Sequence, residues 1–391
     1  MRVVALLLTG WMCGCAAGDA ATHAVVRDSA GVRIVENDLT AELPRYAIGE
    51  GALVEIGAVE GAEPYLLDNV ETARWLGDGS IAVLNGGTGE VRVFDDGGRF
   101  VRAYGRHGGG PGEYRTPLDV WQHGDSLVVM DFGRIVVTSL ADGSARATAP
   151  ASLPGRPYFS ESWFGAGAFV IPVRHGAPEE VGQWRDIAID YVRVSLDGSR
   201  VDTIVRVAGG REGLVQLNVG EGIRAVTITP PLFAGRARAT VHDSRLFAGV
   251  SLERRIVEYD SAGRPIHDIR WTSPGEPVTA GLLETYIAAR AGASRTTREG
   301  IEALERTDTF PHFDGLLTDA EGRLWMRSYD LPGQTTLPYW TVFDTAGIAE
   351  AVVEMPRGIQ LYEVRRDRVL GMREDSVGVQ HVVVLPIRRG G

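Results

Sequence analysis

The 391-residue sequence contains no lysine, and all 40 of its basic residues are arginine. Without lysine the chain cannot form a Schiff base through a side-chain amine, build a Ser-Lys dyad or supply the lysine of a P-loop. The 51 acidic residues give a net charge of -11. Nucleic-acid binding needs a basic face that neutralises phosphates, so this charge balance argues against it.

Cysteine is also scarce, because only Cys13 and Cys15 occur. They follow Arg2 and a short apolar run that cannot span a bilayer. Met12-Cys13-Gly14-Cys15 resembles a bacterial lipobox, although Met12 and Cys13 replace the usual Leu-like and small residues.

The lipobox resemblance implies that residues 1–14 are a signal peptide and that Cys15 is lipidated. Residues 15–23 would then tether the protein to the bacterial cell envelope, in the periplasm or at the outer membrane. The alternative is an ordinary secretory signal that is cleaved nearby. Acylation of Cys15 leaves no pair of cysteines for a disulfide, so stability must come from packing.

A repeat of four short apolar strands runs along the chain. Its clearest copy starts at Val70, and Asp/Gly turns separate the strands. Further copies open at Leu118, Phe159, Ala237, Phe313 and Leu361. Four strands at a period of roughly 40 to 50 residues are typical of propeller blades. We predict an all-β fold, a six-bladed β-propeller over residues 24–391. A sandwich or a solenoid would not explain why the same Asp/Gly turn returns before the last strand of successive copies.

Two segments depart from the repeat. The sixth copy shows only three strands, and residues 24–35 read as strand, turn, strand. We expect this N-terminal segment to pair with residues 361–387, because an open ring would leave strand edges unpaired. Residues 276–311 instead show helical spacing, which predicts a helical hairpin inserted between the fourth and fifth blades. Its apolar residues should pack on a propeller face; they are Leu282, Leu283, Ile287, Ile301 and Leu304.

The segment from Gly105 to Tyr114 reads Gly-Arg-His-Gly-Gly-Gly-Pro-Gly-Glu-Tyr, with Pro117 shortly after it. It resembles the linker between NHL repeats. The chain as a whole resembles NHL-like, or TolB-like, six-bladed propeller lipoproteins of the bacterial envelope, most strongly over residues 67–145. Such propellers include RNA-binding, protein-binding and sensing proteins and a few enzymes, so the resemblance implies a fold more than an activity.

No convincing catalytic set is visible. Gly124-Asp125-Ser126-Leu127 spells the GDSL hydrolase motif, but no histidine follows an aspartate by three positions, as the base of that family does. Other copies have an Asp/Gly turn at the same place, so we predict a hairpin turn. The eight histidines lack the paired spacing of a zinc site. An enzymatic function is therefore less favoured than a non-catalytic one.

Acidic residues stand near the start of the first strand in several copies, and we predict that they face the central channel as ligand candidates. They are Glu71, Asp119, Glu161 and Asp314. If a divalent cation such as Ca²⁺ binds there, Glu71, Asp119 and Asp314 are its expected ligands. Their placement, though not their sequence, resembles that of the metal ligands in gluconolactonase-like propellers. The alternative is a solvated channel whose acids accept hydrogen bonds from backbone amides.

The leading hypothesis is a non-catalytic binding module on the envelope that recognises a protein, a peptide or a glycan, with no cofactor expected. The alternative is a metal-dependent hydrolase or lactonase acting in the channel, which would need three or more carboxylates within reach of one ion.

Overall fold

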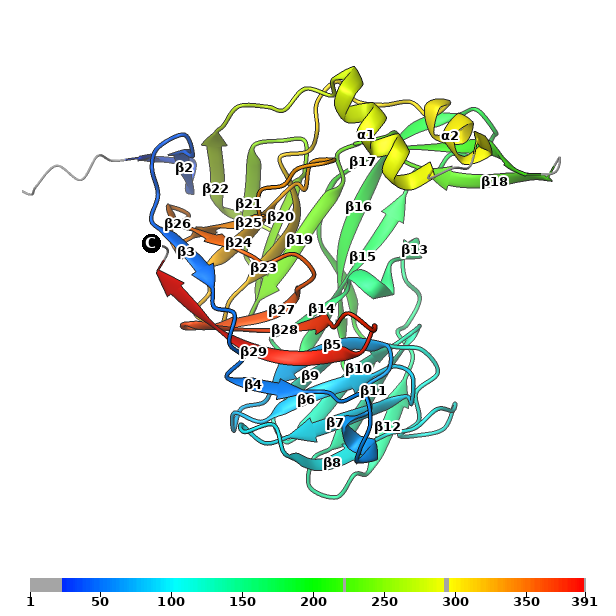
Figure 1. Ribbon diagram of the computed structural model, residues 1–391, viewed down its shortest axis with the longest axis vertical. Helices are drawn as coiled ribbons and strands as arrows, with labels where there is room; N and C mark the ends of the chain where they lie inside the picture. The colour runs from blue at the N-terminus through cyan, green and yellow to red at the C-terminus, as the bar shows by residue number, and fades with distance from the viewer. Residues whose placement is uncertain (1–22, 221–222, 292–294, 390–391) are drawn as a thin grey trace, which may run out of the picture.

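A computed structural model describes residues 23–220, 223–291 and 295–389. The predicted signal peptide 1–14 and the lipidation site Cys15 lie outside the described residues, as does all but the last residue of the tether 15–23. Figure 1 shows the chain passing from blue and cyan strands through green strands to orange and red ones, which return beside the blue β3 and β4. The fold is a six-bladed β-propeller, as predicted.

Each blade is an antiparallel sheet, and the first strands of neighbouring blades contact one another around the centre. Blades 1 and 2 consist of β5 (Val70–Trp75), β6 (Ile81–Asn85), β7 (Glu90–Phe94) and β8 (Phe100–Tyr104), then β9 (Pro117–His123), β10 (Ser126–Asp131), β11 (Arg134–Ser139) and β12 (Ala145–Thr148). Blades 3 and 4 consist of β14 (Trp163–Gly165), β15 (Ala168–His175), β16 (Trp184–Ser195) and β17 (Val201–Gly220), then β19 (Ala237–His242), β20 (Arg245–Val250), β21 (Arg255–Tyr259) and β22 (Pro265–Thr272).

Blade 5 consists of β23 (Phe313–Thr318), β24 (Leu324–Ser328), β25 (Tyr339–Phe343) and β26 (Ala349–Glu354). Blade 6 contains β27 (Gln360–Arg365), β28 (Arg368–Glu374) and β29 (Gln380–Arg389). Blade 3 is enlarged by β13 (Arg156–Pro157), which pairs with β15, and by β18 (Ile223–Thr229), which pairs with β17. Five predicted blade starts agree with these strands to within one residue. The third does not, because Phe159–Glu161 is a 3-10 turn and β14 starts at Trp163.

The Asp/Gly turns that revealed the repeat have a clear physical role. In the turn before β22, the Asp260 carboxylate accepts hydrogen bonds from the amides of Ala262 and Arg264, both at 2.9 Å. Asp344 accepts the same pair of amide hydrogen bonds before β26. Gly263 and Gly347 adopt φ values of 75° and 82°, where a side chain would be strained. The turn chemistry thus needs Asp first and Gly fourth, which explains its recurrence.

The core is divided among the interfaces between blades. Within the described residues, each pair of neighbouring blades shares an apolar cluster, including blades 6 and 1. At that last interface Trp75 and Phe94 of blade 1 lie in one cluster with Leu370 and Val382 of blade 6. The ring is therefore closed by side-chain packing as well as by strand pairing.

The strand that completes blade 6 is not the predicted one. β4 (Val54–Ile56) pairs antiparallel with β29, and Ile56 is fully buried opposite Val382. β1 (Ala24–Ser29) and β2 (Val32–Asp38) instead extend the rim of blade 4, where β2 runs parallel to β22. The expectation for residues 24–35 is therefore wrong, although the ring does close by pairing the two ends of the chain. Between these segments, β3 (Arg45–Ile48) joins β26 of blade 5 to β29 of blade 6.

The predicted helical insert is present between blades 4 and 5, as α1 (Ala280–Ala291) and α2 (Arg295–Glu302), outside the ring (Figure 1). Leu282, Leu283, Ile301 and Leu304 pack with Leu232, Phe233 and Phe310, and Ile287 is buried on α1. The insert lies at the end of the ring where β19 and β23 begin. No helix in the described parts of the chain has the length and apolar character needed to cross a bilayer.

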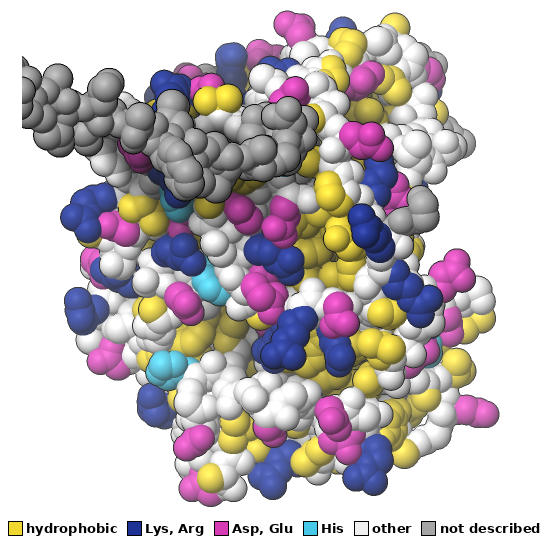
Figure 2. All heavy atoms as spheres, turned by 90° about the vertical axis from the view of Figure 1, so that its left-hand side faces the viewer, with side chains coloured by type: hydrophobic (Ala, Val, Ile, Leu, Met, Phe, Trp, Pro, Cys, Tyr) yellow, Lys and Arg dark blue, Asp and Glu magenta, His cyan; other side chains and the backbone are white. Residues whose placement is uncertain are grey.

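The outer surface carries both signs of charge. Figure 2 shows arginine and acidic side chains interspersed over the face that carries β2, β3 and the end of β29. Many of them form ion pairs between neighbouring strands, such as Arg27 with Glu36 at 2.7 Å and Arg45 with Glu354 at 3.1 Å. Exposed pairs of this kind contribute at most about 1 kcal/mol each.

Candidate functional site

The first strands of all six blades end at one cavity of about 680 Å³. We call it the central cavity. Its lining comes from the last residues of β5, β9, β14, β19, β23 and β27 and from the turns that follow them. Because six separate blades each contribute side chains, the cavity exists only in the closed ring. Its volume falls within the range of small-molecule and cofactor sites, about 300 to 1,000 Å³.

Aromatic side chains form the wall of the central cavity on the side of blades 1 to 3. Trp75, Trp121 and Trp163 each stand at or near the end of a first strand, and Phe164 follows directly. The rings of Trp121 and Phe164 lie 6.0 Å apart between centroids, and both pack on the buried Phe169. Trp121, Trp163 and Phe164 are only partly buried, so each offers aromatic surface to a ligand.

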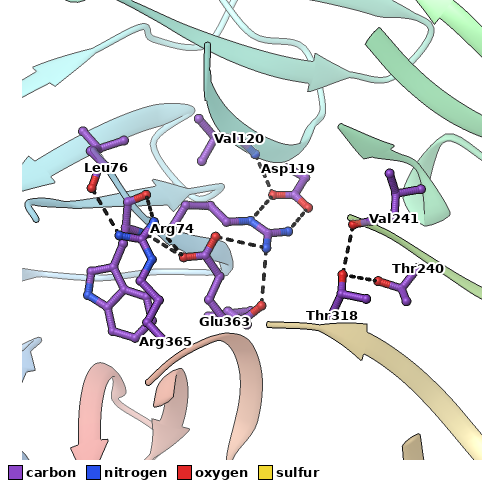
Figure 3. Close-up of polar contacts among 11 residues, drawn as sticks. Arg74, Leu76, Asp119, Val120, Thr240, Val241, Thr318, Glu363 and Arg365 are labelled. Atoms are coloured by element: carbon purple, nitrogen blue, oxygen red, sulfur yellow. Dashed lines mark hydrogen bonds and ion pairs between the residues drawn. The ribbon is translucent and has the colours of Figure 1, made fainter. Parts of the chain in front are cut away.

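A network of charged groups occupies the side of blades 1, 2 and 6 (Figure 3). The Arg74 guanidinium donates two hydrogen bonds to Asp119, at 2.6 and 3.2 Å, and lies 3.6 Å from Glu363. Glu363 accepts a hydrogen bond from the amide of Trp75 at 2.9 Å. Arg365 donates to the carbonyl of Trp75 at 3.0 Å. The network thereby links the first strands of three blades through side chains.

These charges are about four-fifths removed from solvent, since the side chains of Arg74, Asp119 and Glu363 are 20, 20 and 23 % exposed. Burial alone would lower the pKa of Arg74, but Asp119 and Glu363 outweigh it and raise that pKa. Burial raises the pKa of Glu363 above its ordinary value, although Arg74 and the Trp75 amide act in the opposite direction. Arg74 therefore stays charged and holds the two carboxylates together.

Threonines join the blades on the other side of the cavity. The Thr318 hydroxyl donates to the carbonyl of Val241 at 3.0 Å and lies 3.3 Å from the Thr240 hydroxyl (Figure 3). His123 and His242 also line the cavity, and His123 makes a ring contact with Phe164 at 5.6 Å. The central cavity therefore presents aromatic rings, hydroxyl groups and imidazole groups to a ligand, with the ion network along one side.

The four predicted acids do not converge. Asp119 belongs to the network beside the central cavity, and Glu71 interacts with the Asn69 side chain near the start of β5. Asp314 forms a two-point ion pair with Arg327, at 2.5 and 2.6 Å, at the opposite end of the ring. Glu161 lies on the 3-10 turn before β14 and lines a different cavity. The four do not form one ligand set because most of them are engaged locally: Asp119 by Arg74, Glu71 by Asn69 and Asp314 by Arg327.

Within the three described stretches of chain, no group of three or more His, Cys, Asp or Glu residues could hold a metal ion. Asp119 and Asp314, two of the three expected ligands, are each neutralised by an arginine instead. Arginine thus neutralises two of the three carboxylates that were considered as ligands of a divalent cation.

Sequence reasoning missed Arg74, Glu363 and the tryptophans. A signal for the tryptophans was present: Trp75, Trp121 and Trp163 each precede a glycine by two or three residues in successive copies. No sequence signal pointed to Arg74 and Glu363. They lie far apart in the sequence, in the first and last blades, and become neighbours only when the ring closes.

The raised pKa of Glu363 gives a pH prediction. The folded state binds the Glu363 proton more tightly than the unfolded chain does, so this group's contribution to stability falls as pH rises from the ordinary Glu pKa of 4.5 through the raised value. Urea unfolding gives the free energy of unfolding of the wild type and of Glu363→Gln. The wild-type value minus the Glu363→Gln value should be larger near pH 4.5 than at about pH 8. A difference that is the same at both pH values would contradict the raised pKa.

A family profile supports the propeller fold over part of the chain. The profile of the DUF5128 family, described as a 6-bladed beta-propeller, matches residues 58–149. A DUF4221-family structure from Bacteroides vulgatus is similar with a TM-score of 0.54 at 8 % identity, covering 89 % of this chain and 100 % of the other. A structure from Bacteroides fragilis, described as an exported protein, has a TM-score of 0.46 at 11 % identity, covering 90 % and 100 %. No curated protein sequence is significantly similar to this chain.

Proposed function

We propose that this chain is a lipid-anchored, NHL-like binding module of the bacterial envelope that recognises a glycan in its central cavity. The observation that carries the proposal is the set of partly exposed rings, Trp121, Trp163 and Phe164, beside hydroxyl and imidazole groups in a cavity of about 680 Å³. The lipobox-like sequence at Cys15 supports the anchor, and the Gly-rich linker from Gly105 to Tyr114 supports the NHL-like assignment.

The chemistry of the lining favours a glycan over the other ligands considered. A sugar ring has an apolar face that fits an indole ring and hydroxyls that need hydrogen-bond partners. His123 and the Thr240–Thr318 pair line the same cavity. The charged groups beside the rings already bond to one another, so their role is to hold three blades in register. A peptide or a protein loop is the competing ligand.

The hydrolase or lactonase alternative has less support. It requires several carboxylates around one ion, and Asp119, the candidate acid nearest the central cavity, is engaged by Arg74. Ser126 of the GDSL-like sequence lies at the first position of β10, directly after a two-residue hairpin turn. A nucleophilic serine needs a histidine base within hydrogen-bond distance, and no such contact with Ser126 is found in the described residues.

Replacement of Trp121 by alanine tests the proposal. We expect the wild-type protein to bind at least one member of a panel of neutral oligosaccharides. Trp121→Ala should weaken that binding about tenfold or more, because a central aromatic anchor is lost. Phe132→Ala is the matched control, since Phe132 is 65 % exposed on the β10–β11 turn, away from the cavity. Binding that survives in Trp121→Ala, or a wild type that binds only peptides from a parallel peptide library, would contradict the glycan proposal.

A further inference from the structure

A second cavity, of about 600 Å³, lies between blade 3 and the start of β19. We call it the arginine cavity, because its lining includes Arg156, Arg174, Arg211, Arg236 and Arg238. It borders the face of the ring where the first strand of blade 4 begins, whereas the central cavity lies where the first strands end. Ile187, Ile189 and Tyr191 of β16 supply its apolar surface.

The charge of the arginine cavity is opposite to that of the whole chain. Five arginines face two carboxylates, Glu161 and Glu212, which leaves a net charge of +3 in a chain whose net charge is -11. The surface in Figure 2, by contrast, mixes both signs over short distances. A concave basic site with low-dielectric walls concentrates anions.

Only part of this positive charge is neutralised by the protein. Arg174 pairs with Glu212, while Arg211 lies over the Trp184 ring at 5.9 Å and 3.8 Å from Glu305. In the part of the chain that the structure describes, no side-chain hydrogen bond or ion pair reaches the guanidinium groups of Arg156, Arg236 or Arg238. Most surface arginines of this protein do have such partners, for example Arg264 with Asp260 at 2.7 Å.

Two of the guanidinium groups also have a buried nitrogen without a partner. The Nε–H groups of Arg174 and Arg238 are both enclosed and donate no hydrogen bond within the described structure. Arg174 is only 7 % exposed. Burial lowers the pKa of Arg238, with Glu161 offsetting part of that effect. Buried donors without an acceptor are costly, so the free cavity is less favourable than one holding an anion.

We propose that the arginine cavity binds a small organic anion that carries a carboxylate or a phosphate group. Arg236 and Arg238 meet the anionic group, Arg156 adds charge at the rim, and the aliphatic and tyrosine side chains of β16 hold the rest of the molecule. Guanidinium groups suit both anions because their planar N–H donors match pairs of anionic oxygens. The volume is that of an organic ligand rather than of a single ion.

The test uses three probes at low ionic strength: inorganic phosphate, D-glucuronate, and neutral D-glucose as the matched control. Thermal melts and calorimetric titrations of the wild-type protein should show stabilisation by phosphate or by glucuronate, and none by glucose. Stabilisation by only one of the two anions identifies the anionic group. The shift should shrink as salt is added, because salt screens the attraction.

Arg238→Gln should weaken anion binding about tenfold to hundredfold, the value of a charge-assisted hydrogen bond pair. The same change should leave the melting temperature of the free protein unchanged or higher, because it removes a guanidinium that has no partner. If Arg238 had only a structural role, Arg238→Gln would lower the melting temperature of the free protein. Arg156→Gln, at an exposed position, provides a second variant should Arg238→Gln fold poorly.

Arg146→Gln is the charge-matched control, since Arg146 is exposed on β12 and does not line the cavity. It should bind the anion as the wild type does. Absence of any anion-dependent shift in the wild type would overturn the proposal. Equal affinity in Arg156→Gln, Arg238→Gln and Arg146→Gln would overturn it as well.

Discussion

Replacement of Ile56 by alanine is expected to lower the free energy of unfolding by about 2 to 5 kcal/mol, the usual cost of truncating a buried isoleucine. Ile56 has no exposed surface, and its strand β4 is the segment that completes blade 6. Its neighbours in the cluster come from both the first and the last blade, including Trp75 and Val382. The cavity left by the mutation would therefore weaken the interface that closes the ring. Urea unfolding should show a lower midpoint with an unchanged slope.

Val26→Ala is the control for ring closure. Val26 lies on β1, which the sequence favoured as part of the closing segment, and it is 39 % exposed at the rim of blade 4. Its replacement should change the free energy of unfolding by no more than about 0.5 kcal/mol. If Val26→Ala proved as costly as Ile56→Ala, residues 24–35 and not β4 would be closing the ring.

Replacement of Arg74 by methionine is expected to lower the free energy of unfolding by about 3 kcal/mol. The change leaves Asp119 and Glu363 largely buried without their common cation, and removing one partner of a buried ion pair is usually costly. The apolar stem of methionine keeps much of the packing beside Trp121, whose ring centroid lies 5.5 Å from the Arg74 guanidinium carbon. Chemical unfolding at neutral pH measures the loss.

Two further variants separate this effect from a general loss of surface charge. Arg99→Met removes the ion pair with Asp95 on the surface, where Arg99 is 86 % exposed, and should lower the free energy of unfolding far less than Arg74→Met does. Adding Glu363→Gln to Arg74→Met should recover part of the lost stability, because one uncompensated carboxylate disappears. Equal costs for Arg74→Met and Arg99→Met would show that the network beside the central cavity contributes no more than a surface pair.

Much of the fold could be predicted because the repeat is local. Each Asp/Gly turn is specified by a few adjacent residues, as Asp260 and Gly263 show, so it can be read without knowing what surrounds it. The strand starts at Val70, Ala237 and Phe313 follow directly from that pattern. The helical insert was also visible, because Leu282, Leu283 and Ile287 depart from the period of a strand.

The closing strand could not be found in the same way. β4 has only three residues, Val54–Ile56, and no turn of the repeated kind precedes it. Asp28 to Gly31 does spell such a turn, and it does form a hairpin, but that hairpin lies at the rim of blade 4. Whether a strand completes a blade or extends one depends on which sheet edge lies near it, and that edge is formed by residues far away in sequence.

The sequence by itself determined the number of blades, their order and the type of turn that joins the strands, because these depend on contacts among neighbouring residues. Only the tertiary structure decided which charges meet. Arg74 and Glu363 become neighbours because blades 1 and 6 are adjacent in a closed ring, and Arg238 comes to face blade 3 because β19 begins beside β17. Interactions between side chains on different blades depend on the position of whole sheets, and no local pattern in the sequence records that position.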